Sequence, residues 1–277
     1  MTFTKLRLKW GPKANDTVTF RFGIMNNYEP YLVKGITGLE PVTHTVSLAD
    51  RAEEGAGFQG RRPDNRQIVV QLGFQPDYSL GQTVESLRRF LYPMLVPKLD
   101  YSVQVTLLNE EETETWRTWG QVSKTPTNPF TKEPEMQITI DCLGPYWLGK
   151  DYVHPTPNSL SGKLSFDIDN AGDAPTGWEI VVGITAVKTN FEIFRGDSKA
   201  WVLITYPFAL GDQITINTVM GSRALTLLRN GVTTNMLQYF SPNSTYFQMD
   251  GGINTFLPLY TNYTVKSWKH TPRFLGI

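Results

Sequence analysis

The chain has 277 residues, enough for one large or two ordinary domains. Its 26 basic and 26 acidic side chains cancel, so counterion release would contribute little affinity for nucleic acid, and the low net charge favours association with other proteins. The single cysteine, Cys142, excludes an intramolecular disulfide. No run of about 18 apolar residues predicts a membrane span, and the first ten residues lack the apolar core of a signal peptide.

Alternating apolar and polar residues, the pattern of a half-buried β-strand, dominate the first half of the chain. They predict strands at residues 5–10, 18–22, 68–74, 101–107 and 136–142. Cys142 falls on the inward phase of the last of these strands. We therefore expect a buried structural thiol there, not a reactive one.

One segment has the spacing of a helix. Its apolar residues lie four, three and four positions apart, at Leu80, Val84, Leu87 and Leu91. We expect the helix to begin near Thr83, to be stopped by Pro93 and Pro97, and to cover the core of a sheet.

The second half follows a stretch rich in Gly and Pro, which predicts a linker at 149–162 between domains at 1–148 and 163–277. Further strands are predicted at 164–168, 178–184, 214–216 and 263–265. Asn230-Gly231 predicts a hairpin turn between strands at 224–228 and 236–240. Short strands separated by turns indicate β-sandwiches, so the expected fold is mainly β, with two β-sandwich-like domains and one helix.

The segment 50–66 is polar and Gly-rich and joins two predicted strands. A connection of this length within a domain is either functional or a mobile tip. Composition favours the flexible hairpin tip, and an arm that reaches a neighbouring subunit is the alternative.

Two motif matches fail on their context. Gly55, Gly57 and Gly60 form a literal GxGxxG, but a strand follows where a dinucleotide site needs the start of a helix. Asp167 and Asp169 begin a calcium-loop pattern whose later ligand positions hold apolar residues.

The three histidines are scattered, and no pair has metal-ligand spacing. Nothing in the sequence selects the paired carboxylates of a glycoside hydrolase, so an enzyme is the weakest of three function classes. The sequence predicts no catalytic residue, no cofactor and no metal site.

Five segments, in order along the chain, resemble the distal tail protein (Dit) family of long-tailed siphophages. They are Ile36–Glu40 with Asp64–Val70, Val84–Tyr92, Asn128–Lys132 with Gln137–Cys142 and Pro145–Trp147, Asn170–Ile180, and Pro272–Gly276. The resemblance implies an N-terminal domain with a long arm that forms a six-membered ring at the distal end of the tail. It also implies a C-terminal galectin-like sandwich outside the ring.

The partners implied by the resemblance are further copies of the chain, the tail tube protein, the tail hub and, as an option left open, receptor-binding or fibre proteins. We expect assembly in the host cytoplasm and a final place in the virion. Arg61, Arg62 and Arg66 are the candidate inter-subunit contacts. The alternative function is a carbohydrate-binding module that contacts glycans of the host surface.

Overall fold

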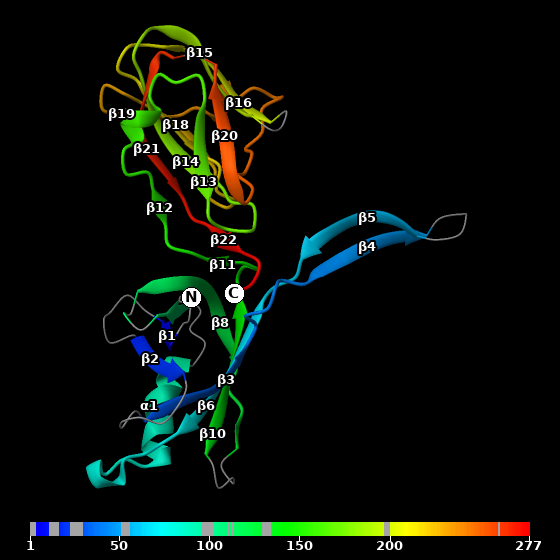
Figure 1. The fold of residues 1–277 in the computed structure, drawn as a ribbon, viewed down its shortest axis with the longest axis vertical. Coiled ribbons are helices and arrows are strands. Elements are labelled where there is room, and N and C mark those ends of the chain that lie inside the picture. Colours follow the sequence, from blue (N-terminus) through cyan, green and yellow to red (C-terminus); the bar gives the residue numbers. More distant parts are fainter. Residues whose placement is uncertain are drawn as a thin grey trace. The chain divides into compact units, whose positions relative to one another are not determined.

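The structure, a computed structural model, describes residues 4–10, 17–22, 30–50, 56–95, 102–109, 111, 113–128, 134–196, 200–259 and 261–277. Two compact units are present, one of residues 1–148 with 275–277 and one of residues 149–274. The chain thus enters the second unit after Leu148 and returns to the first at Leu275 (Figure 1). The described part is mainly β with one α-helix, which confirms the predicted fold class.

The first unit contains all five of the predicted early strands and several more. Its elements are β1 (Lys5–Lys9), β2 (Thr17–Phe22), β3 (Tyr31–Thr37), β4 (His44–Asp50), β5 (Ala56–Pro63), β6 (Gln67–Phe74), η1 (Tyr78–Leu80), α1 (Val84–Leu95), β7 (Val103–Leu108), β8 (Glu114–Lys124), β9 (Thr127–Asn128), β10 (Glu135–Cys142) and β11 (Trp147–Leu148).

Seven strands of this unit close on themselves as a barrel. Their order is β8-β7-β1-β2-β3-β6-β10, and β10 pairs again with β8. Closure depends on β8, whose first part pairs with β7 and whose last part pairs with β10; Gly120 lies opposite both Val103 and Cys142. A Cβ atom at Gly120 would lie 2.6 Å from the carbonyl oxygen of Asp141, so the close approach of the two strands requires glycine there.

The residues on the inward-facing side of the predicted strands fill the interior of the barrel. Leu6, Leu8, Ile68, Val70, Leu72, Ile138 and Ile140 are all at most 1% exposed. Cys142 is 3% exposed and has no disulfide partner, and burial raises the pKa of its thiol to about 11. The predicted burial of this thiol is confirmed.

Helix α1 begins where its sequence predicts but ends later. Thr83 caps it, because the Thr83 hydroxyl accepts a hydrogen bond of 3.1 Å from the Ser86 amide. Leu87, Leu91 and Leu95 are buried, as a core-covering helix requires. The stop at Pro93 was wrong, because Pro93 lies in the last turn, where its missing N–H removes a single helical hydrogen bond.

The buried position predicted for Leu80 was also wrong. Leu80 ends the separate 3₁₀ turn η1 and is 73% exposed. Gly81 follows with φ of +72°, which breaks the helical path between η1 and α1. The apolar spacing that includes Leu80 therefore spans two elements.

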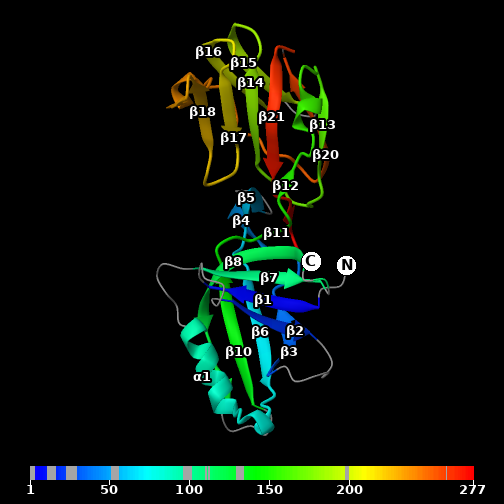
Figure 2. The ribbon, with the colours of Figure 1, turned by 90° about the vertical axis from the view of Figure 1, so that its left-hand side faces the viewer.

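The second unit is a two-sheet sandwich. Its elements are β12 (Tyr152–Val153), η2 (Pro157–Leu160), β13 (Phe166–Asn170), β14 (Trp178–Ile184), β15 (Lys188–Arg195), β16 (Trp201–Phe208), β17 (Gln213–Asn217), β18 (Ala224–Arg229), β19 (Val232–Asn235), η3 (Leu237–Tyr239), β20 (Gly252–Pro258), β21 (Tyr263–His270) and β22 (Arg273–Phe274). One sheet has the order β12-β21-β14-β17-β18-β19 and the other β13-β20-β15-β16 (Figure 2). Elements β12 and η2 lie within the segment 149–162 expected as a linker, and Leu160 of η2 is buried.

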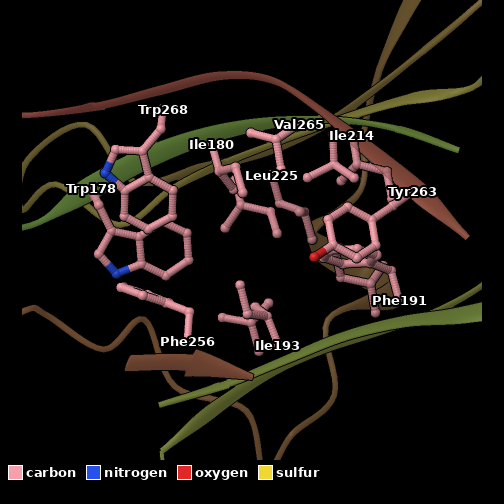
Figure 3. Close-up of a cluster of buried hydrophobic side chains, with 14 of the residues drawn as sticks. Trp178, Ile180, Phe191, Ile193, Ile214, Leu225, Phe256, Tyr263, Val265 and Trp268 are labelled. Carbon is pink, nitrogen blue, oxygen red and sulfur yellow. The ribbon is translucent and has the colours of Figure 1, made fainter. Parts of the chain in front are cut away.

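Aromatic side chains fill one end of the sandwich core (Figure 3). Trp178 and Trp268 stack with ring centroids 5.2 Å apart, and Phe256 packs edge-on against Trp268 at 4.7 Å. Each such side chain contributes about 1.5–3 kcal/mol when fully buried. The predicted inward orientation of Trp178 agrees with its 0% exposure.

The hairpin predicted at Asn230-Gly231 is present, with φ of 52° and 78° at the two residues. Its second strand is β19, residues 232–235, and the strand predicted at 236–240 was wrong. That stretch forms η3 instead, with Met236 buried just ahead of it.

Candidate assembly site

Strands β4 and β5 form a two-stranded arm that is separate from the barrel sheet. They pair only with each other among the described strands, from His44 opposite Pro63 to Asp50 opposite Ala56. Figure 1 shows the arm as the long blue hairpin that leaves the barrel. An isolated two-stranded hairpin is at best marginally stable in water, so the arm is expected to gain stability from a covering surface.

One face of the arm is apolar and uncovered. Val46 and Leu48 share this face because they are two residues apart on one strand, and the partners opposite them are Arg61 and Phe58. Val46 is 51% exposed, Leu48 60% and Phe58 65%. A contiguous exposed group of large apolar side chains marks an interaction surface. We call these four residues the arm face.

The opposite face of the arm is polar. Thr45 lies opposite Arg62, and the Thr45 hydroxyl donates a hydrogen bond of 2.5 Å to Asp64. The Thr43 hydroxyl donates a second, of 3.1 Å, to the same carboxylate. The Thr45 bond is the main cause of a lowered pKa at Asp64, with a smaller contribution from the charge of Arg62. Thr43, Thr45 and Asp64 are therefore hydrogen-bonded to one another within the chain.

Arg66 fixes the base of the arm. Its guanidinium donates hydrogen bonds to four carbonyl oxygens of the first unit, those of Gly38, Glu40, Pro145 and Leu275. Arg66 is 6% exposed, and its guanidinium lies 5.7 Å from the ring centroid of the buried Trp147. Burial lowers the pKa of Arg66 from its usual value, although arginine remains charged at any physiological pH.

The segment before the arm is shaped to meet Arg66. Gly38 has φ of +90°, and a Cβ atom there would lie 2.1 Å from the carbonyl oxygen of Gln67. The Gly38 amide donates to the Glu40 carboxylate at 2.8 Å. Backbone hydrogen bonds from Glu40 itself and from Gly38 lower the pKa of this carboxyl.

Residues 275–277 complete this group of contacts around Arg66, which we call the Arg66 node. The Val42 amide donates to the Leu275 carbonyl, and the Ile277 amide donates to the Leu39 carbonyl, both at 2.9 Å. The last three residues thus run beside the segment 39–42 that leads into β4.

The structure separates the three predicted contact arginines. Arg61 lies on the arm face and Arg62 on the polar face, both exposed, whereas Arg66 is buried at the base. The Arg66 guanidinium already donates hydrogen bonds to four carbonyl oxygens of its own unit. We therefore infer that Arg66 holds the base of the arm in place. The inter-subunit contact predicted for Arg66 stays a prediction, and its burial at 6% exposure does not favour it.

Sequence reasoning missed the apolar residues of the arm face. The alternation of Val46 and Leu48 with Thr45 and Ser47 was a strand signal that went unused. On β5, a register shift opposite Ser47 and Leu48 hides the alternation, because it places Phe58 and Arg61 on one face despite their odd spacing.

Of the two rejected motifs, Gly55 lies outside the described residues, and four other residues lie in strands. Gly57 and Gly60 belong to β5, and Asp167 and Asp169 point outward from β13. Within the described residues, no three His, Cys, Asp or Glu side chains are grouped to hold a metal ion. The same residues include no helix long and apolar enough to cross a bilayer.

Comparison with known proteins agrees with this architecture. Residues 171–274 match the family model of the siphovirus-type tail component, C-terminal domain. No curated protein sequence matches the chain. A crystal structure of the phage SPP1 Dit protein, described as a paradigm of hub adsorption apparatus in phages that infect Gram-positive hosts, is similar with a TM-score of 0.67. Its sequence is 14% identical, and the match covers 97% of this chain and 99% of that one.

A chain of the phage P2 baseplate, in its activated conformation with Ca, aligns over 100% of both chains with a TM-score of 0.46 and 10% identity. The second unit thus resembles the C-terminal domain of siphovirus-type tail components, which are structural proteins of the virion. The chain as a whole has the fold of the SPP1 Dit protein, which confirms the resemblance to the distal tail proteins.

Proposed function

We propose that this chain is a structural ring subunit at the distal end of a long phage tail, where six copies close a ring through their first units. The observation that carries the proposal is the uncovered arm face, because Val46, Leu48 and Phe58 are left in water by their own chain. A surface of one copy that fits a different surface of the next gives a heterologous interface, which closes into a ring when the rotation permits.

The two units then have separate roles. The first unit, with the barrel and the arm, forms the ring and joins the tail tube to the hub. The second unit is a peripheral sandwich with no part in ring closure. Neither role involves catalysis, and the protein is assembled in the host cytoplasm before it enters the virion.

Arg61 is the candidate charged contact within the ring. It shares the arm face with three apolar residues, so a covering neighbour would desolvate its guanidinium beside them. A carboxylate or a set of carbonyl oxygens on the neighbour would then pair with it. Arg62 faces the other way and would contact a different surface or remain in solvent.

The test measures the mass of the purified full-length protein by light scattering, alone and with tail tube protein. We expect a species of six times the chain mass of 31.4 kDa in one of these conditions. Leu48→Asp should shift it to monomers, whereas Ser47→Asp, the same charge one position away on the polar face, should leave it intact. Both residues are exposed, so the thermal unfolding midpoint of the monomer should not change.

A wild-type protein that stays monomeric at every concentration and with tail tube protein would overturn the proposal. Equal loss of assembly in the two variants would remove the arm face as its basis.

A further inference from the structure

The two outer surfaces of the sandwich differ in chemistry. The outer face of the sheet β12-β21-β14-β17-β18-β19 is mostly polar, with Glu179, Gln213, Thr215, Asn217, Thr226, Thr264, Lys266 and Lys269 among its outward positions. On the sheet β13-β20-β15-β16, five of the outward positions are large and apolar: Phe194, Trp201, Leu203, Ile253 and Leu257. We call these five residues the apolar sheet face.

Strand register places the centre of this face in one row. Phe194 of β15 lies opposite Trp201 of β16 on one side and opposite Leu257 of β20 on the other. The Phe194 and Trp201 rings pack edge-to-face with centroids 5.6 Å apart. Leu203 extends the row by one pair along β16, where it lies opposite Glu192. Rigid aromatic side chains at the centre of an apolar patch are typical of the residues that dominate protein interfaces.

Strand β16 is the edge strand of this sheet, and backbone groups on its outer edge already have hydrogen-bond partners. The Ser241 amide donates to the Leu203 carbonyl at 3.0 Å, and the Thr245 amide donates to the Trp201 carbonyl at 2.8 Å. The Ser244 hydroxyl also accepts from the Leu203 amide at 2.8 Å. A partner that adds a strand to this edge is therefore disfavoured, and contact would occur through the side chains of the face.

The charged side chains at the described outward positions of these four strands are all acidic. Glu192 lies within the apolar sheet face, and Asp167 and Asp169 occupy the outward positions of the adjoining strand β13. The described outward positions of these four strands include no Lys or Arg. An acidic border repels the anionic surface of a membrane and the backbone of a nucleic acid, and it attracts basic groups on a protein.

We propose that the apolar sheet face is the docking surface for a second tail protein, one that presents apolar side chains among Lys or Arg residues. The inference rests on the proposed function, which places the chain in a tail among other structural proteins. Apolar contact at Phe194 and Trp201 supplies affinity, and the carboxylates at Glu192, Asp167 and Asp169 select a basic partner and fix its orientation.

The test uses particles of a phage that encodes the full chain, with Phe194→p-benzoylphenylalanine as a photo-cross-linker. Thr215→p-benzoylphenylalanine, on the polar face of the other sheet, is the matched control. We expect irradiation to join position 194 to one other tail protein, at a peptide that contains Lys or Arg, and to join position 215 to none.

A charge variant gives a second readout. Phe194→Lys places a positive charge at the centre of the face and should reduce that tail protein about tenfold per ring in purified particles. Thr215→Lys should leave the composition unchanged. Equal unfolding temperatures of the two purified variants would show that the loss is not a folding defect.

The outcomes separate the two proposals. Absence of the chain from particles would overturn the ring proposal and this inference together. A chain that is present but cross-links at position 194 to its own copies, to host glycan during adsorption or to nothing would overturn the docking inference alone.

Discussion

The guanidinium of Arg66 donates a hydrogen bond to the carbonyl oxygen of Leu275, a residue 209 positions later in the chain. This bond joins the base of the arm to the end of the polypeptide, after the whole second unit has intervened. The direction of the arm therefore depends on residues from three separate parts of the sequence.

We expect Arg66→Lys to destabilise the first unit by about 2–4 kcal/mol, because one ammonium cannot reach four carbonyls and leaves buried acceptors unpaired. Thermal unfolding of the purified monomer measures the loss. Arg62→Lys, on the exposed polar face, is the control and should change stability by less than about 0.5 kcal/mol. Similar effects of the two changes would contradict the role assigned to Arg66.

Deletion of residues 275–277 should loosen the base of the arm without unfolding the barrel. It removes the acceptor of the Val42 amide and the donor to the Leu39 carbonyl. Hydrogen exchange at the Val42 amide should become faster, while amides of β10 keep their protection. Unchanged exchange at Val42 would show that the chain end does not hold this segment.

Gly38→Ala should destabilise the protein by more than about 2 kcal/mol, since both its positive φ and its contact with Gln67 exclude a side chain. Gly60→Ala is the matched control on the arm, because a Cβ atom there has nothing within 4 Å. Chemical denaturation of both variants provides the measurement. A tolerated alanine at Gly38 would mean that this turn has another conformation in solution.

His270 should make the second unit sensitive to acid. It is 4% exposed and its Nδ1 accepts from the indole N–H of Trp268 at 3.4 Å; burial lowers its pKa to about 4, against a smaller opposing effect of Asp169. Between pH 6.5 and 4 the unfolded chain binds a proton that the folded chain does not. The free energy of unfolding therefore decreases by up to about 3 kcal/mol as the pH is lowered through this range. Unfolding curves at pH 7 and pH 4.5 test this, and His270→Gln should flatten the difference. An equal pH dependence in the variant would exclude His270 as the cause.

Strand periodicity predicted the fold where a strand has one buried face. Residues 68–74, 136–142 and 178–184 are such strands, and each was identified from alternation alone. In the arm, only β4 has this alternation, in the short run from Thr45 to Leu48, and the prediction did not use it. The Gly-rich β5 contains a register shift, which removes the alternation on which the method relies.

The Arg66 node had no signal in the sequence. Its acceptors are backbone carbonyls, and any residue can supply a carbonyl, so no residue type reveals them. Two positions require glycine: Gly38, which has a positive φ, and Gly276, where a Cβ atom would lie 2.6 Å from the Pro41 nitrogen. A glycine in a sequence does not say what it approaches. The five ordered segments did locate the region, since both Ile36–Glu40 and Pro272–Gly276 lie in it.

Because the first unit includes residues 275–277, the second unit is an insertion within the first and not an appendage at its end. Such an insertion can be exchanged for another domain if the new domain enters after Leu148 and leaves at Leu275. Recombination at these two joints would replace the second unit and leave the first unit with its own residues 275–277. A gene truncated after Leu148 would encode the first unit without residues 275–277, which bond the segment at the base of the arm.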